Sequence, residues 1–259
     1  MARTIAKTKN TIYRKIKRLM GEKYSGGISF RALRDTLRLL RGEPFEYVAS
    51  RTSFCSCIID LSLKPHIPRS GTESWVRDAM ETLKIEGRSR PRCLDIFSGS
   101  GCVGIAVLKQ VPDATMDFID IDETFLKQIT INLKLNGIEE NRATLIQSDL
   151  FKNVHAQYDY IFANPPYVPR GIKGRVAKEI FDYEPHHTFF AGTDGLELIR
   201  PFLSSVREHL NPGGTLWMEY DVSQRNAIED MLVAEGYTEF NFINHEADER
   251  YLVLADIAK

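Results

Sequence analysis

The alternation of apolar and polar positions changes its period along the 259-residue chain. Two helices are predicted in the first 40 residues, where apolar side chains recur every three or four positions, at Ile5, Ile12, Ile16, Leu19 and Met20 and then at Phe30, Leu33, Leu37 and Leu40. Ser29 follows the Gly26-Gly27 break and is the expected N-cap of the second helix. Between Phe54 and Leu63 the period shortens to two residues, which indicates strands or a hairpin.

From Thr72 onward, the pattern predicts helices that alternate with short apolar strands. One helix begins at Thr72 and is followed by a polar linker at 86–92. Strands are then expected at 93–97, 115–121, 143–147, 158–163 and 215–220, and helices at 102–110, 123–136, 196–210 and 223–235. This order predicts a parallel sheet with helices on both faces. The last two strands, 240–243 and 251–257, have no helix between them, which predicts an antiparallel pair at one edge.

Composition excludes several classes of protein. A hydrophobic fraction of 43% argues against a disordered chain. No run approaches the ~18 apolar residues of a membrane span, and no apolar core of a secretory signal follows the first charges. The four cysteines do not have the spacing of a zinc site, so we expect no metal and read them as small buried side chains. We therefore expect a cytoplasmic protein with no membrane contact.

The net charge of −1 conceals a split along the chain. Residues 1–41, called the basic segment below, carry 12 basic and two acidic side chains, whereas the other 218 residues carry 22 basic and 33 acidic ones. This asymmetry favours contact between the basic segment and an anionic partner, such as ribosomal RNA or an acidic protein surface. A solvated helix without a partner and a mitochondrial transit peptide remain open alternatives.

The first candidate motif is a glycine-rich turn between a strand and a helix. The turn residues Phe97, Ser98, Gly99, Ser100 and Gly101 precede the helix that is expected at 102–110. Glycines let a ligand approach the backbone, and a helix N-terminus offers free N–H groups. The pattern Gly99-x-Gly101-x-x-Gly104, with Asp120 about 20 residues further on, is compatible with nicotinamide or S-adenosyl-L-methionine binding, or with a purely structural turn.

Asp95 favours S-adenosyl-L-methionine among these alternatives. A carboxylate four residues before Gly99 suits a cationic or amino-bearing ligand, which a pyrophosphate is not. Asp120 would accept hydrogen bonds from both ribose hydroxyls of such a ligand. Each acid also has a simpler explanation, since Asp95 can cap the turn and Asp120 can form a surface ion pair.

The second candidate motif is Asn164-Pro165-Pro166-Tyr167, directly after the strand expected at 158–163. Open α/β sheets bind ligands at this carboxyl edge, and two prolines make the peptide rigid. The Asn164 side-chain oxygen and the Pro165 carbonyl could each accept one N–H of a planar NH2 group, which would direct the nitrogen lone pair at a methyl donor, while Tyr167 could stack on the group. A turn built on a proline pair is the alternative.

Together these motifs resemble the HemK/PrmC family, methyltransferases that modify the glutamine of the Gly-Gly-Gln motif in peptide-chain release factors. The resemblance runs from about residue 30 to the C-terminus. It includes both motifs and Asp120, and in addition Gly42–Tyr47, Ile67–Glu73, Ser148–Phe151, Glu184-Pro185, Gly192–Leu196, Pro212–Gly214, Glu219 with Gln224, and Asp248–Arg250. The family fold is a class I S-adenosylmethionine-dependent methyltransferase: a seven-stranded, Rossmann-like, mostly parallel sheet with an antiparallel C-terminal hairpin strand.

The resemblance also implies roles for individual residues. Asp95 and the turn 97–101 would bind the methionine part of the cofactor and Asp120 its ribose, Asp149 and Leu150 would frame the adenine, and Asn164 would touch both the cofactor and the substrate amide. Asp149 can also be a helix or turn cap. We interpret Asp122 as a helix cap, and His186 and His187 as surface or substrate-loop residues. For Glu219, the alternative to a role in the family pattern is that it only satisfies backbone donors at the sheet edge.

Two departures from the family pattern stand out. Phe97 occupies the usual position of the first glycine of the turn, and family members usually have a longer helical N-terminal domain. We therefore expect three parts: a basic helical segment at 1–50 that is a reduced substrate-docking domain, a β-hairpin linker at 51–70, and the methyltransferase domain at 71–259. The expected reaction is methylation of the side-chain N5 of a release-factor glutamine. Glutamine methylation of a ribosomal protein and adenine-N6 methylation of nucleic acid are the alternatives.

Overall fold

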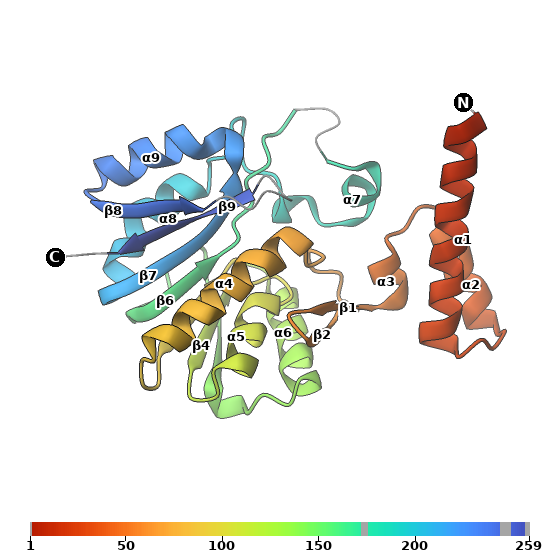
Figure 1. The fold of residues 1–259 in the computed structure, drawn as a ribbon, viewed down its shortest axis with the longest axis horizontal. Helices are drawn as coiled ribbons and strands as arrows, with labels where there is room; N and C mark the ends of the chain where they lie inside the picture. Colours follow the sequence, from red (N-terminus) through yellow and green to blue (C-terminus); the bar gives the residue numbers. More distant parts are fainter. Residues whose placement is uncertain (1, 172–175, 244–249, 257–259) are drawn as a thin grey trace.

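A seven-stranded sheet forms the body of the protein in the computed structural model, which describes residues 2–171, 176–243 and 250–256 (Figure 1). From one edge to the other, the strands are β5 (Ala143–Gln147), β4 (Thr115–Asp120), β3 (Arg92–Ile96), β6 (Tyr158–Ala163), β7 (Leu210–Asp221), β9 (Arg250–Asp256) and β8 (Glu239–Ile243). The five strands from β5 to β7 are parallel, whereas β9 runs antiparallel to β7 and β8. The predicted sheet and its C-terminal antiparallel strands are confirmed.

Helices cover both faces of the sheet. Side chains of α4 (Ser70–Glu86), α5 (Cys102–Gln110) and α6 (Glu123–Leu135) pack into one hydrophobic cluster, and those of α8 (Ile199–Val206) and α9 (Arg225–Ala234) into another. Along β6, Tyr160 and Phe162 face the first cluster while Ile161 and Ala163 face the second. Both faces of β6 are therefore buried, which explains why its sequence is apolar from Tyr160 to Ala163.

The strand order reverses between β3 and β6. From β3 the chain builds outward through β4 to β5, and from β6 it builds in the other direction through β7. Loops at the carboxyl ends of β3 and β6 therefore turn to opposite faces of the sheet and leave a crevice between them. The glycine-rich turn follows β3 and Asn164 follows β6, so the topology brings the two motifs together.

The first three helices of the chain, α1 (Ala2–Tyr24), α2 (Phe30–Leu40) and α3 (Phe45–Ala49), lie to one side of the sheet in Figure 1. Ser29 caps α2 as expected, because its side chain accepts the N–H of Ala32. Asp35 is buried between α1 and α2, where it pairs with Lys23 and Arg38. The sequence did not predict α3, since five residues are too few to show a helical period.

The apolar positions that predict α2 point to solvent. Phe30 is 93% exposed, and Leu33, Leu37 and Leu40 are also exposed, whereas Ala32, Asp35 and Leu39 are buried. We call the four exposed side chains the α2 stripe. Periodicity correctly predicts a helix here, but it does not tell a core-facing side from a side that meets a partner.

Other predicted elements differ in their bounds. The predicted hairpin is confirmed, but it lies at 51–60: β1 (Arg51–Phe54) pairs antiparallel with β2 (Cys57–Asp60), and Cys55 and Ser56, which have positive φ, form the turn between them. The helix expected at 196–210 is shorter, since it begins only at Ile199, after the turn of Gly195. Ile257, expected in the last strand, lies outside the described residues, and the three-part domain division stays a prediction.

The structure also bears on the excluded classes. All four cysteines are buried free thiols, as expected. Within the described part of the chain, no helix is long and apolar enough to cross a membrane. No group of three or more potential metal-binding side chains was found among the same residues.

Candidate active site

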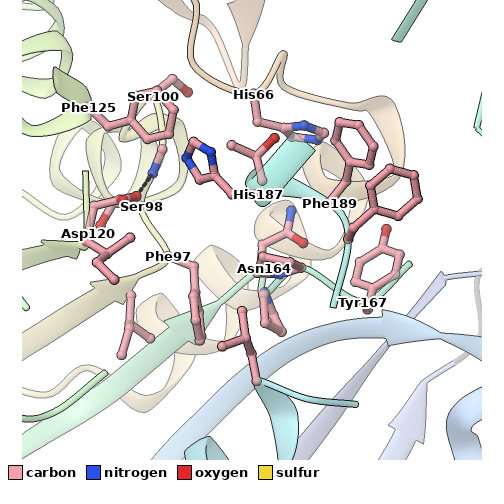
Figure 2. Close-up of a pocket in the computed structure, with 18 of the residues that line it drawn as sticks. His66, Phe97, Ser98, Ser100, Asp120, Phe125, Asn164, Tyr167, His187 and Phe189 are labelled. Atoms are coloured by element: carbon pink, nitrogen blue, oxygen red, sulfur yellow. Dashed lines mark hydrogen bonds between the residues drawn. The ribbon is translucent and has the colours of Figure 1, made fainter. Parts of the chain in front are cut away.

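A cavity of about 390 Å³ lies at the carboxyl ends of β3, β4 and β6. Both sequence motifs reach it (Figure 2), and the predicted site residues that line it are Asp95, Phe97, Ser98, Gly99, Ser100, Asp120, Asp149, Leu150, Asn164, Pro165, Pro166 and Tyr167. Gly101 is the exception, because it sits behind the turn at the start of α5. Residues far apart in the sequence thus share one site of a size that suits a small-molecule ligand.

The three glycines in and after the turn are required at their positions for different structural reasons. A Cβ on Gly104 would lie 2.4 Å from the ring of Phe118, so this glycine lets α5 approach β4. A Cβ on Gly101 would meet Ile129 at 2.9 Å. Gly99 differs, because a Cβ there would meet no protein atom within 4 Å. The space beside Gly99 belongs to the cavity and is open to a ligand.

Phe97 adopts the left-handed conformation that makes glycine usual at this position. Its φ is 62°, which costs a non-glycine residue roughly 1 kcal/mol or more. The ring packs edge-on against Phe202 of α8, with 5.7 Å between ring centroids. This packing holds the side chain while the backbone still lines the cavity, so the departure from the family pattern leaves the turn intact.

Asp95 is a buried carboxyl at the base of the cavity. It accepts the N–H of Gly104 at 2.8 Å. Burial raises the pKa of Asp95 to about 8; the N–H of Gly104 lowers it, and the charge of Asp120 raises it further. Among the described residues, no basic side chain compensates this carboxylate. A cation bound in the cavity would stabilise the ionised form.

Asp120 ends β4 and faces the same cavity. Its Oδ2 accepts the N–H of Gly99 at 2.8 Å, and its Oδ1 accepts the N–H of Asp122 at 3.0 Å. Burial raises the pKa of Asp120 above its ordinary value, although both N–H groups act against this. The surface ion pair that the sequence left open does not fit a buried residue. Asp122 caps α6 through the N–H of Thr124, as predicted.

Asp149 and Leu150 border the cavity after β5. Leu150 has a φ of 51°, so the chain turns sharply and its side chain reaches the cavity. Asp149 is partly exposed and pairs with Lys152, and its backbone oxygen accepts the N–H of Lys152 at 3.3 Å. Asp149 thus supports a local turn and lines the cavity at once.

The Asn-Pro-Pro-Tyr segment forms the opposite wall, and Figure 2 shows Asn164 between Phe97 and Tyr167. The Asn164 Nδ2 donates to Thr72 Oγ1 at 3.3 Å. The Tyr167 hydroxyl donates to Glu219 Oε1 at 2.8 Å. Glu219 Oε2 in turn accepts hydrogen bonds from Thr72 and Trp75 of α4. The alternative that Glu219 only satisfies backbone donors does not fit, because this residue is buried and its carboxylate accepts hydrogen bonds from side chains of α4 and of the segment after β6.

A segment after Tyr167 covers the cavity and is anchored by a buried carboxylate. Glu184 follows α7 (Lys178–Tyr183) and contacts Arg69 and, at 2.8 Å, His66 Nδ1. Burial alone would raise the pKa of Glu184, but His66 and Arg69 outweigh it and hold the pKa below its usual value. Glu184 also accepts the N–H of Ile67. These contacts fix the segment to the chain before α4.

His187 follows α7 in sequence and lines the cavity. Its ring stacks on Phe125 with 5.6 Å between centroids, and its Nε2 is 3.7 Å from Asp122 Oδ2 (Figure 2). The prediction of an exposed loop residue is consistent with its exposure, but it also lines the cavity. His66 and His187 could not be recognised as cavity residues from the sequence, because no local pattern distinguishes them. Thr72 belongs to the segment Ile67–Glu73, whose resemblance to the family is the sequence feature that could have identified it as a cavity residue.

Comparison with known proteins finds methyltransferases, both among protein families and among individual relatives. Residues 78–193 match the family described as "MTS: Methyltransferase small domain". The release factor glutamine methyltransferase of Geobacter sulfurreducens is 30% identical over 204 residues, which cover 77% of this chain and 68% of that protein. The chain belongs to the HemK/PrmC family. Its class of enzyme is therefore that of the S-adenosylmethionine-dependent protein-glutamine methyltransferases.

Other relatives within and beyond the family differ in what they modify. The ribosomal protein uL3 glutamine methyltransferase of Francisella tularensis is 30% identical over 188 residues, which cover 72% of this chain and 59% of that protein. Among solved structures, the 16S rRNA N2 G1207 methyltransferase of T. thermophilus, in complex with AdoMet and guanosine, has a TM-score of 0.57 at 16% identity, covering 80% of this chain and 49% of that one. The latter likeness shows the methyltransferase fold.

Proposed function

We propose that this enzyme transfers the methyl group of S-adenosyl-L-methionine to the side-chain N5 of the glutamine in the Gly-Gly-Gln motif of a peptide-chain release factor. The observation that carries the proposal is the shared cavity. Asn164 and Pro165 lie at the carboxyl end of β6, across the cavity from the turn at Gly99 and from Asp120. A methyl donor on one wall and an amide on the other can therefore meet.

The cavity residues fit the proposed cofactor. The ionised form of Asp95 suits a ligand that carries an ammonium and a sulfonium group, and the open space at Gly99 admits it. Asp120 at the end of β4 can accept hydrogen bonds from ribose hydroxyls. Ser98, Ser100 and Phe97 supply backbone groups to the same wall, and Leu150 with Asp149 borders the region assigned to adenine. When bound, the cofactor supplies an electrophilic methyl group.

The residues of β6 and its loop act on the amide. An amide nitrogen is a weak nucleophile because its lone pair is delocalised into the carbonyl. The Asn164 Oδ1 and the Pro165 carbonyl each accept one N–H of the substrate, which fixes the NH2 group and favours development of the lone pair. Pro166 keeps the peptide rigid, and Tyr167 packs on the planar amide. Catalysis is then mainly positioning and electrostatics.

The α2 stripe supports a protein partner for the N-terminal helices. Four exposed apolar side chains lie next to the exposed Arg31, Arg34 and Arg41. Nucleic acid contacts rely on cations and phosphate, whereas an apolar stripe gains stability only from another apolar surface. We therefore propose that the segment at 1–50 docks an acidic protein substrate, with ribosomal RNA contact through the basic segment as the alternative.

Methylation of a ribosomal protein is the second candidate, supported by the similarity to the uL3 enzyme of Francisella tularensis. Adenine-N6 methylation is the third, because the Asn-Pro-Pro-Tyr segment would also accept the N–H groups of an aryl amine. Among these, the resemblance to release factor enzymes covers the larger share of the related protein.

Incubation with methyl-labelled S-adenosyl-L-methionine tests the proposal. The substrates are a release factor, its Gly-Gly-Gln variant with glutamine replaced by alanine, ribosomal protein uL3, tRNA and DNA. We expect label on the release factor and none on the alanine variant. Label on uL3 alone would favour the second candidate, and label on nucleic acid alone would contradict the proposal.

A further inference from the structure

A chain of hydrogen bonds runs from the core of the protein to Asn164. Thr72 Oγ1 lies 2.7 Å from Glu219 Oε2, and Trp75 Nε1 lies 2.9 Å from the same oxygen. The Asn164 Nδ2 lies 3.3 Å from Thr72 Oγ1. Thr72 is 2% exposed and Glu219 is 1% exposed, so both side chains are buried. The hydrogen bonds connect α4, the carboxyl-terminal part of β7 and the residue after β6.

The direction of each hydrogen bond follows from the chemistry of the groups. An indole N–H can only donate, and a carboxylate can only accept. Thr72 therefore directs its single hydroxyl proton at Glu219 and is left with lone pairs towards Asn164. Only the NH2 end of the Asn164 amide can satisfy them. The order of donors thus determines the orientation of an amide whose two ends are otherwise nearly equal in shape.

We propose that Thr72, itself oriented by Glu219, is a positioning residue that keeps the Asn164 side-chain oxygen turned towards the substrate. This inference rests on the proposed role of Asn164 in holding the substrate amide. A flipped Asn164 would present its NH2 group to the NH2 group of the substrate. Two donors would then face each other, and the substrate nitrogen would lose an acceptor at the position where its proton must be held.

The test compares Thr72→Val with Thr72→Ser. Valine has nearly the shape of threonine but cannot accept from Asn164, whereas serine keeps the hydroxyl. We expect Thr72→Val to lower kcat about 10- to 100-fold, with the dissociation constant of S-adenosyl-L-methionine within about twofold of wild type. Thr72→Ser should keep most of the kcat. Thr82→Val is the matched control on α4, because the Thr82 hydroxyl donates only to the backbone oxygen of Asp78 among its described contacts.

A double-mutant cycle separates positioning from a general structural role. If Thr72 acts through Asn164, then Thr72→Val should cost little more once Asn164→Ala is already present. If Thr72 had only a structural role, Thr72→Val would lower kcat by the same factor in the wild-type and in the Asn164→Ala enzyme. Thermal unfolding of every variant shows whether it is folded, and Thr72→Ala, with the same expected loss of kcat, replaces Thr72→Val if the buried valine prevents folding.

The possible outcomes are distinct. A folded Thr72→Val enzyme with wild-type kcat overturns the inference alone, as does an equal loss in the Asn164→Ala background. A wild-type enzyme that methylates no glutamine contradicts the proposed function, and this inference with it. Loss of kcat in Thr72→Val, its rescue by serine and its disappearance without Asn164 would together support the inference.

Discussion

The two walls of the cavity position their chemical groups by different means. On the wall formed by the residues at the ends of β3, β4 and β5, the backbone does most of the positioning: Phe97, Gly99 and Leu150 have positive φ, and backbone N–H groups hold Asp95 and Asp120. On the wall of β6, side chains do it, because Asn164 and Tyr167 depend on Thr72 and Glu219. The first wall is suited to holding a cofactor of fixed shape, and the second to orienting a reacting amide.

The comparison predicts that substitutions on the two walls have separable effects. Asn164→Ala should lower kcat by about 100- to 1000-fold, because the amide loses an acceptor that matters most in the transition state. The affinity for S-adenosyl-L-methionine should mostly survive. Steady-state kinetics and calorimetry measure the two quantities on the same protein. Wild-type activity of the Asn164→Ala enzyme would contradict the proposed mechanism.

Asp95, on the other wall, should affect the affinity for S-adenosyl-L-methionine and not mainly kcat, and this effect should depend on pH. Its folded pKa of about 8 lies above the ordinary value of 3.8, so ionisation costs stability, and the ligand-free protein should lose stability as pH rises between these values. A cationic cofactor favours the ionised form. Its affinity should therefore rise between about pH 6 and about pH 9, by roughly tenfold or more.

Asp95→Asn is the control for this titration. Asparagine keeps the shape but carries no charge, so the rise in cofactor affinity with pH should flatten, as measured by calorimetry at each pH. Asp120 also has a raised pKa and lies close by, which leaves a weaker residual dependence. An unchanged slope in Asp95→Asn would assign the titration to another group.

Two glycines on the cofactor wall should respond differently to alanine. Gly104→Ala places a Cβ 2.4 Å from Phe118 and should lower the free energy of unfolding by about 1–3 kcal/mol. Gly99→Ala meets no protein atom and should cost roughly 1 kcal/mol from its positive φ alone, while weakening cofactor binding. Denaturant unfolding and calorimetry separate these effects. Equal cofactor affinities for Gly99→Ala and wild type would show that no ligand occupies the open space.

The smallest expected effect concerns the α2 stripe, which lies on neither wall. Phe30→Ser with Leu33→Ser should change stability by no more than about 0.5 kcal/mol, because both side chains are exposed. The KM for a full-length release factor should rise by roughly two- to fivefold, with no change for a short Gly-Gly-Gln peptide. An equal rise in KM for the release factor and for the peptide would contradict a docking role of the α2 stripe.

The same contrast explains how much the sequence could predict. The cofactor wall follows from local pattern, since a short apolar strand, closely spaced glycines and an acid at the end of the next strand lie within about 30 residues. The sheet, the site at its carboxyl edge and the cap of α6 at Asp122 were predicted for the same reason. Local residues determine these features.

The network on the other wall could not be predicted in this way. Thr72, Asn164 and Glu219 are separated by about 90 and about 50 residues, and their hydrogen bonds exist only once α4, β6 and β7 are packed. His66 and Glu184 meet although 118 positions separate them in the sequence. The exposure of the α2 stripe was missed because an apolar period indicates a helix face but not what covers it.

The most direct test of the account is to locate the transferred methyl group by tandem mass spectrometry. A release factor treated with S-adenosyl-L-methionine and the wild-type enzyme is digested, and the peptide with the Gly-Gly-Gln motif is fragmented. We expect one added methyl group on the side-chain nitrogen of that glutamine, and almost none after treatment with Asn164→Ala. A methyl group on another residue, or an equal yield from Asn164→Ala, would contradict it.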